Sequence, residues 1–308
     1  SCSSTAEVLA MISARVFSPA AACVCTAAGS DLLSAANAGE TASVDSIPLI
    51  ASSIMSKKIA SGADAIVLDV KVGNGAFMKN MQDAEKLAKQ MVMIGTNSGR
   101  NTIAVISDMN EPLGYAVGNA LEVKEAVDTL KGRGPEDVVE LCLELGAQML
   151  IASEITDDRQ VAVDMLKKSI EDGSAYAKFA EFVKGQGGDV SVLDDCDSII
   201  NASYIVNVVS ENSGYVSSIQ SELIGETAMI LGGGRQNKGD DIDHSVGVVL
   251  SKKVGDKVDK GDVIATIYAN DKDRIEAANE LIVKAFAIQK EIVDTYPLIK
   301  RIISCKNI

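Results

Sequence analysis

The chain has 308 residues, of which 47% are hydrophobic and 23% are charged. This composition is typical of a folded protein and excludes a disordered acidic polymer, and the length favours two domains over one. A formal net charge of −14 would repel a phosphate backbone, which disfavours a dedicated nucleic-acid binder. The sequence has no run of about 20 apolar residues, so we expect no membrane-spanning segment.

Residues 1–40 are poor in charge and rich in alanine and serine. They predict a short helix at 7–15 and then no regular period, so we expect a poorly defined leader. From Thr41 the pattern sharpens, and 44–62 predicts a helix with one apolar face, ended by glycine.

Between residues 63 and 200 the sequence alternates between strand and helix patterns. Short apolar runs predict buried parallel strands at 65–70 and 101–106. Amphipathic stretches predict four helices, at 83–98, 120–131, 135–145 and 157–173. This alternation predicts an α/β fold with a mixed sheet flanked by helices.

Residues 201–308 predict a separate C-terminal α+β module that is richer in strands. The expected strands are 203–209, 213–219, 246–250 and 263–268. The turn-rich stretch 253–261 between the last two is typical of a small β-hammerhead. A long amphipathic helix is expected over 273–295.

The cysteine and histidine content limits the metal chemistry and the compartment. His244 is the only histidine, so a mononuclear site with three His ligands from one chain is excluded. Cys142, Cys196 and Cys305 stand singly among apolar neighbours. This is typical of reduced thiols and favours a cytoplasmic location.

Ser53 and Lys57 form the first candidate site. They stand four residues apart in the predicted helix, so both side chains point along one face. A hydroxyl and an ammonium on one face can contact a planar polar ligand. The alternative is an ordinary helix end, where a lysine lies near the negative pole of the helix dipole.

The second candidate is the stretch 69–79, which directly follows a predicted strand, the place where open parallel sheets bind ligands. Gly73 and Gly75 allow close backbone approach, and Phe77 could present its ring to a base. The stretch matches neither the dinucleotide fingerprint nor a Walker loop. A plain strand-to-helix turn is the alternative.

Leu113, Ala116 and Glu125 form the third candidate. Loop carbonyls and one carboxylate can hold a hard monovalent or divalent cation. A loop followed by a helix, without any bound ion, fits the same pattern.

From Thr41 to the C-terminus the chain resembles the pyrimidine-nucleoside phosphorylase and thymidine phosphorylase family. The resemblance is carried by the stretches 41–79, 107–132, 213–219 and 232–271. It implies a small helical domain, of which 41–62 would be a remnant, beside a large α/β domain in a homodimer. It also implies reversible phosphorolysis, in which a pyrimidine nucleoside and phosphate give the base and (deoxy)ribose 1-phosphate without an organic cofactor.

The resemblance assigns roles to the candidate residues. Ser53 and Lys57 stand at positions that contact the base in this family, and Phe77 corresponds to a ring that packs near the base. Leu113 and Ala116, by their carbonyls, and Glu125, by its carboxylate, correspond to ligands of a potassium ion.

Other family features have no counterpart in the sequence. The family's phosphate loop, Lys-His-Ser followed by a glycine run, is missing, and Ala-Gly-Glu-Thr at 38–41 replaces a run that begins with a base-contacting arginine. We therefore expect a truncated chain without activity of its own, which exposes the apolar face of 44–60. The alternatives are a non-catalytic homologue with a base-binding or dimerisation surface and, from the turns near Lys257 and Lys260, a carrier module of the lipoyl type.

Overall fold

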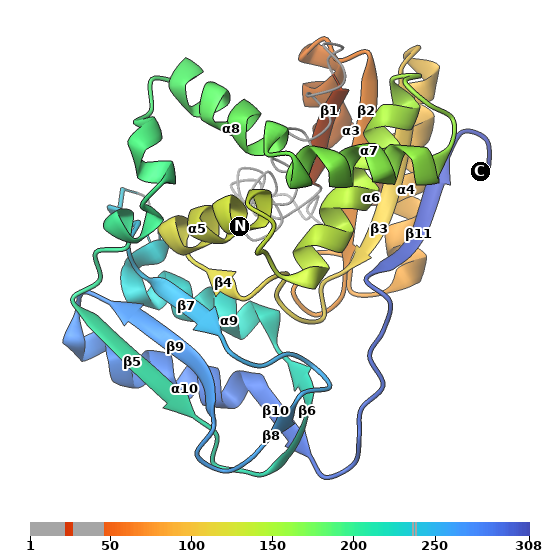
Figure 1. Ribbon diagram of the computed structural model, residues 1–308. Helices are drawn as coiled ribbons and strands as arrows, with labels where there is room; N and C mark the ends of the chain where they lie inside the picture. The colour runs from red at the N-terminus through yellow and green to blue at the C-terminus, as the bar shows by residue number, and fades with distance from the viewer. Residues whose placement is uncertain (1–21, 27–45, 236, 238) are drawn as a thin grey trace.

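The computed structural model describes residues 22–26, 46–235, 237 and 239–308. It is a mixed α/β protein, as predicted, with helices packed on both faces of a first sheet and a second, strand-rich part below it (Figure 1). The predictions for the rest of residues 1–45 lie outside the described residues. None of the described helices is long and apolar enough to cross a membrane.

The first sheet has the strand order β1-β2-β3-β11. Its strands are β1 (Ala22–Thr26), β2 (Ala65–Val72), β3 (Asn101–Asp108) and β11 (Ile299–Ser304). The first three are parallel and β11 is antiparallel to β3. Sequence analysis predicted β2 and β3 as parallel strands and missed β1 and β11, which are short and weakly patterned.

Two helices cover one face of this sheet, α3 (Ile47–Ala60) and α4 (Met81–Asn97). The apolar side of α3, which includes Ile54 and Met55, is buried against α4 and the sheet. The expectation that this side would be exposed is therefore wrong, since α4 supplies a partner from within the chain. The even-numbered residues of β2 point into this core.

The opposite face of the sheet is covered by α6 (Glu136–Ala152), which contacts β1, β2 and β3. Further helices extend this layer, namely α5 (Asn119–Leu130), α7 (Arg159–Glu171) and α8 (Ser174–Gly185), followed by the short turns η1 (Val190–Leu193) and η2 (Cys196–Ile199). Helix α8 was not predicted. It is separated from α7 by Gly173, whose φ of +77° stops the first helix.

The C-terminal part contains two small sheets, with the orders β4-β7-β9-β5 and β10-β6-β8. Their strands are β4 (Ala116–Val117), β5 (Tyr204–Val209), β6 (Gly214–Ile219), β7 (Gly247–Leu250), β8 (Lys257–Val258), β9 (Val263–Ala269) and β10 (Phe286–Gln289). The helical elements are α9 (Ser221–Ala228), the π-turn η3 (Met229–Gly233), η4 (Lys272–Arg274) and α10 (Ile275–Ala285).

Two features of this part differ from the sequence prediction. The helix expected over 273–295 ends at Ala285, because the next four residues form β10 and pair with β6. After β10 the chain leaves the C-terminal sheets and returns to the first sheet as β11 (Figure 1). The last residues of the predicted 201–308 module therefore complete the α/β sheet.

Candidate functional site

Ser53 and Lys57 lie on the exposed side of α3, opposite the buried Ile54 and Met55. The helix begins at Ile47 with Pro48 in its first turn and ends before Gly62, whose φ is +76°. Both side chains are exposed and one helical turn apart. The structure thus places the two residues together, while their contact with a base stays a prediction.

Phe77 is half-buried and packs against the same apolar core as α3 and α4. It lies in the loop between β2 and α4, and the loop begins at Gly73, whose φ of +139° favours glycine. A Cβ at Gly73 would lie 2.7 Å from the backbone nitrogen of Asn110, and one at Gly75 would lie 2.5 Å from Cβ of Ser221. The two glycines therefore serve close packing within the protein.

A buried charged cluster lies at the carboxyl ends of β2 and β3. Lys71 Nζ lies 2.7 Å from Asp69 Oδ2 and donates to Ser107 Oγ at 2.9 Å. Ser107 Oγ donates to Asp69 Oδ1 at 2.5 Å. Asp69 and Ser107 are fully buried and Lys71 is 5% exposed. Sequence analysis included Asp69 and Lys71 in the candidate stretch 69–79 but missed Ser107 and the ion pair, although the alternation of Asp69 and Lys71 in a strand places them on one face.

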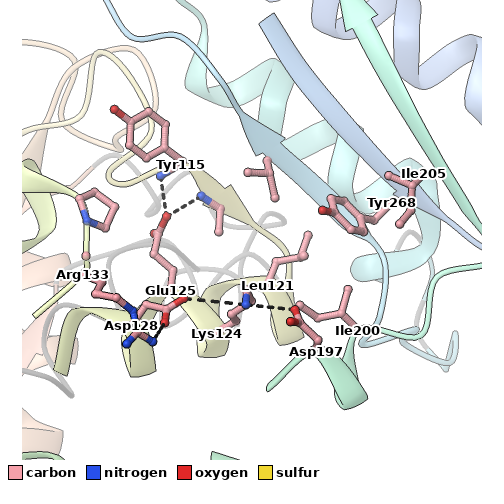
Figure 2. A pocket seen from close by; sticks show the side chains of 14 residues that line it. Tyr115, Leu121, Lys124, Glu125, Asp128, Arg133, Asp197, Ile200, Ile205 and Tyr268 are labelled. Carbon is pink, nitrogen blue, oxygen red and sulfur yellow. Dashed lines mark hydrogen bonds and ion pairs between the residues drawn. The ribbon is translucent and has the colours of Figure 1, made fainter. Parts of the chain in front are cut away.

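Glu125 on α5 holds the loop that precedes the helix. Its Oε1 accepts hydrogen bonds from the backbone N–H groups of Tyr115 at 2.8 Å and Ala116 at 3.0 Å (Figure 2). Gly114 has a φ of +67°, and a Cβ there would lie 2.1 Å from Glu125 Oε2. Burial raises the pKa of Glu125 to about 7, although the two amide hydrogen bonds oppose this shift.

The same loop is tied to α6 and to the C-terminal sheets by a lysine. Lys253 Nζ donates to Asp137 Oδ2 at 2.9 Å and also to the carbonyl of Pro112. Asp137 Oδ2 accepts a further hydrogen bond from the backbone N–H of Gly114 at 2.9 Å. Next to it, burial raises the pKa of Glu111, whose carboxylate accepts from the N–H of Val254. The loop is therefore held by Glu125 on α5, by Asp137 on α6, and by Lys253 and Val254 from the C-terminal part.

Two cavities adjoin this loop, and Tyr115 lines both. The first, of about 600 Å³, lies between α5 and the sheet of β7 and β9, and it is lined by Ala116, Glu125 and further residues (Figure 2). The second, of about 630 Å³, is lined by Leu113 and several acidic side chains. Neither of these two cavities is lined by Ser53, Lys57 or Phe77.

The third candidate site comes from this loop and the helix that follows it. Ala116 donates its backbone N–H to Glu125, and Leu113 is buried in the same loop, while the binding of a cation by the three residues stays a prediction. Burial raises the pKa of Glu125, so its ionisation costs free energy in the folded protein. A bound cation would offset this cost, because its charge would stabilise the carboxylate in place of the lost water. Within the described residues, no three His, Cys, Asp or Glu side chains form a metal-binding group, so any cation here would depend on carbonyl ligands.

Comparison with protein families gives two matches. Residues 21–176 match the model described as "Glycosyl transferase family, a/b domain", and residues 215–289 match "Pyrimidine nucleoside phosphorylase C-terminal domain". The chain belongs to the pyrimidine-nucleoside phosphorylase family. The first match begins at residue 21, so the prediction that residues 1–40 are unmatched needs correction. Strand β1, which pairs with β2, lies between residues 21 and 40 and therefore within this match.

Several curated relatives are similar over most of the chain. Pyrimidine-nucleoside phosphorylase from Bacillus subtilis (strain 168) is 55% identical over 246 residues, which is 80% of this chain and 56% of the relative. The enzyme of the same name from Geobacillus stearothermophilus is 58% identical over 230 residues, covering 75% and 53%. That from Staphylococcus haemolyticus (strain JCSC1435) is 52% identical over 264 residues, covering 86% and 60%. This pyrimidine-nucleoside phosphorylase family member therefore spans little more than half the length of these relatives.

Proposed function

We propose that this protein serves the reversible phosphorolysis of pyrimidine nucleosides, a pentosyl transfer that gives free base and (deoxy)ribose 1-phosphate. The names of the similar proteins support the reaction class. The observation that carries the proposal is the pair Ser53 and Lys57, which lie one turn apart on the exposed side of α3. The substrates are a pyrimidine nucleoside and inorganic phosphate.

The chemistry explains why such a pair would help. Phosphate attacks C1′ as the bond to the base breaks, and the departing base gains negative charge. The Lys57 ammonium and the Ser53 hydroxyl can donate hydrogen bonds to the base oxygens, and these bonds become stronger as that charge develops. Donors that bind the transition state better than the substrate accelerate the reaction. Phe77, which packs against the core beneath α3, would border the base.

We further propose that Glu125 and the carbonyls of Leu113 and Ala116 hold a potassium ion. The ion would supply positive charge next to a carboxylate whose pKa burial raises to about 7. Glu125 would then stay ionised at neutral pH and keep its hydrogen bonds to the amides of Tyr115 and Ala116. No organic cofactor is part of the proposal.

The 308 residues do not contain a Lys-His-Ser run followed by glycines. Loss of a single oxyanion donor lowers kcat about 10²- to 10³-fold, so loss of a whole phosphate loop should lower it further. We therefore propose that the 308-residue chain binds the base but has no measurable turnover of thymidine or uridine. From the sequence we also propose that the protein forms a homodimer and that it is located in the cytoplasm.

The competing proposal is a non-catalytic homologue that keeps only a base-binding or dimerisation surface. Calorimetric titration of the purified chain with uracil and thymine, and then with the nucleosides, tests the base site. We expect binding that Lys57→Met and Ser53→Ala each weaken at least tenfold. Ser52→Ala and Lys89→Met are matched controls, because both residues are exposed on α3 and α4 and should leave the affinity unchanged.

Equal affinities in all four variants would overturn the assignment of the base site. A phosphate-dependent release of thymine or uracil, measured by absorbance, separates the two proposals further. Turnover that Lys57→Met abolishes would refute the expected inactivity and would support the enzyme. An absence of both base binding and turnover would reject the proposed function.

A further inference from the structure

The buried cluster of Asp69, Lys71 and Ser107 has no part in the function proposed so far. All three side chains lie on the face of the first sheet that α6 covers, and Lys71 pairs in register with Ser107. The cluster stands at the carboxyl ends of two parallel strands, where open α/β sheets bind their ligands. Within the described residues, the pairing of β1 with β2 ends at Asp69, before the strand reaches Lys71.

Two hydrogen bonds and one ion pair join the three side chains in a closed triangle. The single proton of Ser107 goes to Asp69, so the serine oxygen is left to accept from Lys71. Asp69 Oδ1 accepts from Ser107, while Asp69 Oδ2 forms the ion pair with Lys71 and has no hydrogen-bond partner among the described residues. An ammonium group has three donors, and Lys71 makes one hydrogen bond, to Ser107, and one ion pair, with Asp69. Among the described residues, these two contacts position the ammonium and leave it at least one further N–H to donate.

Stability alone is a weak explanation for this arrangement. A buried ion pair loses about as much free energy by desolvation as it gains by attraction, and apolar residues of similar volume often replace such a pair without loss. The other residues of β2 on this face, Ala65 and Val67, are apolar and fully packed. An oriented ammonium at a strand end can instead donate a charge-assisted hydrogen bond to an anion, at the place where open α/β sheets bind their ligands.

We propose that Lys71 is an anion-binding residue, whose remaining N–H donates to an oxygen of a phosphate group at the carboxyl edge of β2 and β3. Asp69 and Ser107 are positioning residues that hold the ammonium. The choice of phosphate as the anion rests on the proposed function, in which phosphate is a substrate and a sugar phosphate is a product. The location at the strand end and the free donor do not depend on that function.

The test measures binding of inorganic phosphate to the full 308-residue chain, by ³¹P line broadening at constant ionic strength with chloride as the reference anion. We expect weak, saturable binding, because one ammonium supplies only part of a phosphate site. Lys71→Met should weaken it at least tenfold, since a charge-assisted hydrogen bond is lost. Lys79→Met is the matched control, because Lys79 lies in the following loop with 59% of its side chain exposed. Ribose 1-phosphate, titrated in the same way, shows whether the site prefers the free or the sugar-bound phosphate.

Lys71→Met leaves the Asp69 carboxylate buried without its partner, so this variant could unfold. The double variant Asp69→Asn/Lys71→Met removes both charges together, and circular dichroism shows whether it is folded. Loss of phosphate binding in the folded double variant, with binding kept in Lys79→Met, supports the proposal. Unchanged phosphate binding in the folded double variant, or no saturable binding in the unmodified chain, overturns it.

The outcome is separable from that for the base site. Uracil binding that depends on Lys57, without phosphate binding that depends on Lys71, would leave the proposed function standing and reject this inference. Phosphate binding that depends on Lys71, without any base binding, would support this inference and reject the proposed function.

Discussion

Asn74 and Asn110 are joined by two hydrogen bonds, both donated by Asn74: its backbone N–H reaches Asn110 Oδ1 at 3.1 Å, and its Nδ2 reaches the Asn110 carbonyl at 2.5 Å. The Oδ1 atom of Asn74 accepts from the backbone N–H of Ser221 at 3.0 Å. One side chain thus connects the loop after β2 with the loop after β3 and with the start of α9.

Replacement of Asn74 by alanine should lower the free energy of unfolding by about 2 kcal/mol. The variant loses several hydrogen bonds of about 0.5–1.5 kcal/mol each and leaves the N–H of Ser221 without its partner. Urea denaturation followed by circular dichroism measures the change. Lys89→Ala on the exposed side of α4 is the control, and equal stability of Asn74→Ala and wild type would contradict the connecting role.

Gly75→Ala should destabilise the protein by about 1–3 kcal/mol, because its Cβ would lie 2.5 Å from Cβ of Ser221. The second change Ser221→Gly should recover part of this loss in the double variant, since it removes the clashing atom. Gly225→Ala is the matched control. Nothing lies within 4 Å of its added Cβ, and alanine favours a helix, so this variant should be as stable as wild type or more stable. A Gly75→Ala protein as stable as Gly225→Ala would disprove the close packing.

Glu125 should make stability depend on pH. Its pKa is raised from 4.5 to about 7 in the folded protein, so its ionisation disfavours the folded state. This contribution to stability is fully present below pH 4.5 and is lost as the pH rises through about 7. Glu125→Gln keeps an oxygen for the two amides and cannot ionise. Between pH 5 and pH 8, the free energy of unfolding of the variant should therefore rise by about 1–3 kcal/mol relative to that of wild type.

The same pair of proteins, wild type and Glu125→Gln, also tests the proposed potassium site. At pH 8, potassium chloride should raise the melting temperature of wild type and leave that of Glu125→Gln unchanged, with choline chloride at equal ionic strength as the control. A wild-type response identical to that of the variant would speak against a cation at Glu125. A difference between wild type and variant that does not change with pH would speak against the raised pKa.

Glu144 and Arg159 form an ion pair in which the carboxylate is 3% exposed and the guanidinium lies on the surface. Glu144 also accepts from Gln148 Nε2 at 2.7 Å. Arg159→Ala should destabilise the protein by about 2–4 kcal/mol, because it leaves a buried charge without its cation. Lys178→Ala, which removes a surface ion pair with Glu181, should cost less than about 0.5 kcal/mol. Similar losses in the two variants, measured by urea denaturation, would contradict this difference.

The α/β class and most elements could be predicted from the sequence, because long segments with a clear period bury one face. Strand β2 and helix α4 are examples, since the apolar run and the amphipathic pattern both end at glycines that stop the element. The shared face of Ser53 and Lys57 follows from the helical period alone and was predicted for the same reason. Their distance to other elements does not follow from any local pattern.

Other elements depend on pairing partners far along the chain. The residues of β10 continue the apolar pattern of α10, so only their hydrogen bonds with β6 decide that they form a strand. The buried charges of Asp69 and Lys71 interrupt an apolar run. They pair with each other, and the hydroxyl that hydrogen-bonds both, that of Ser107, comes from the next strand. The sequence alone cannot show that the polar group of one strand lies beside that of another.

Strand β11 closes the edge of β3 only after all of the C-terminal sheets have been made, since β3 ends at Asp108 and β11 begins at Ile299. During synthesis on the ribosome, the backbone donors and acceptors along that edge have no β11 to pair with until the residues from Ile299 onward have been made. The nascent chain therefore carries an open β3 edge while residues 109–298 are synthesised, and such an edge can pair with a strand of another chain.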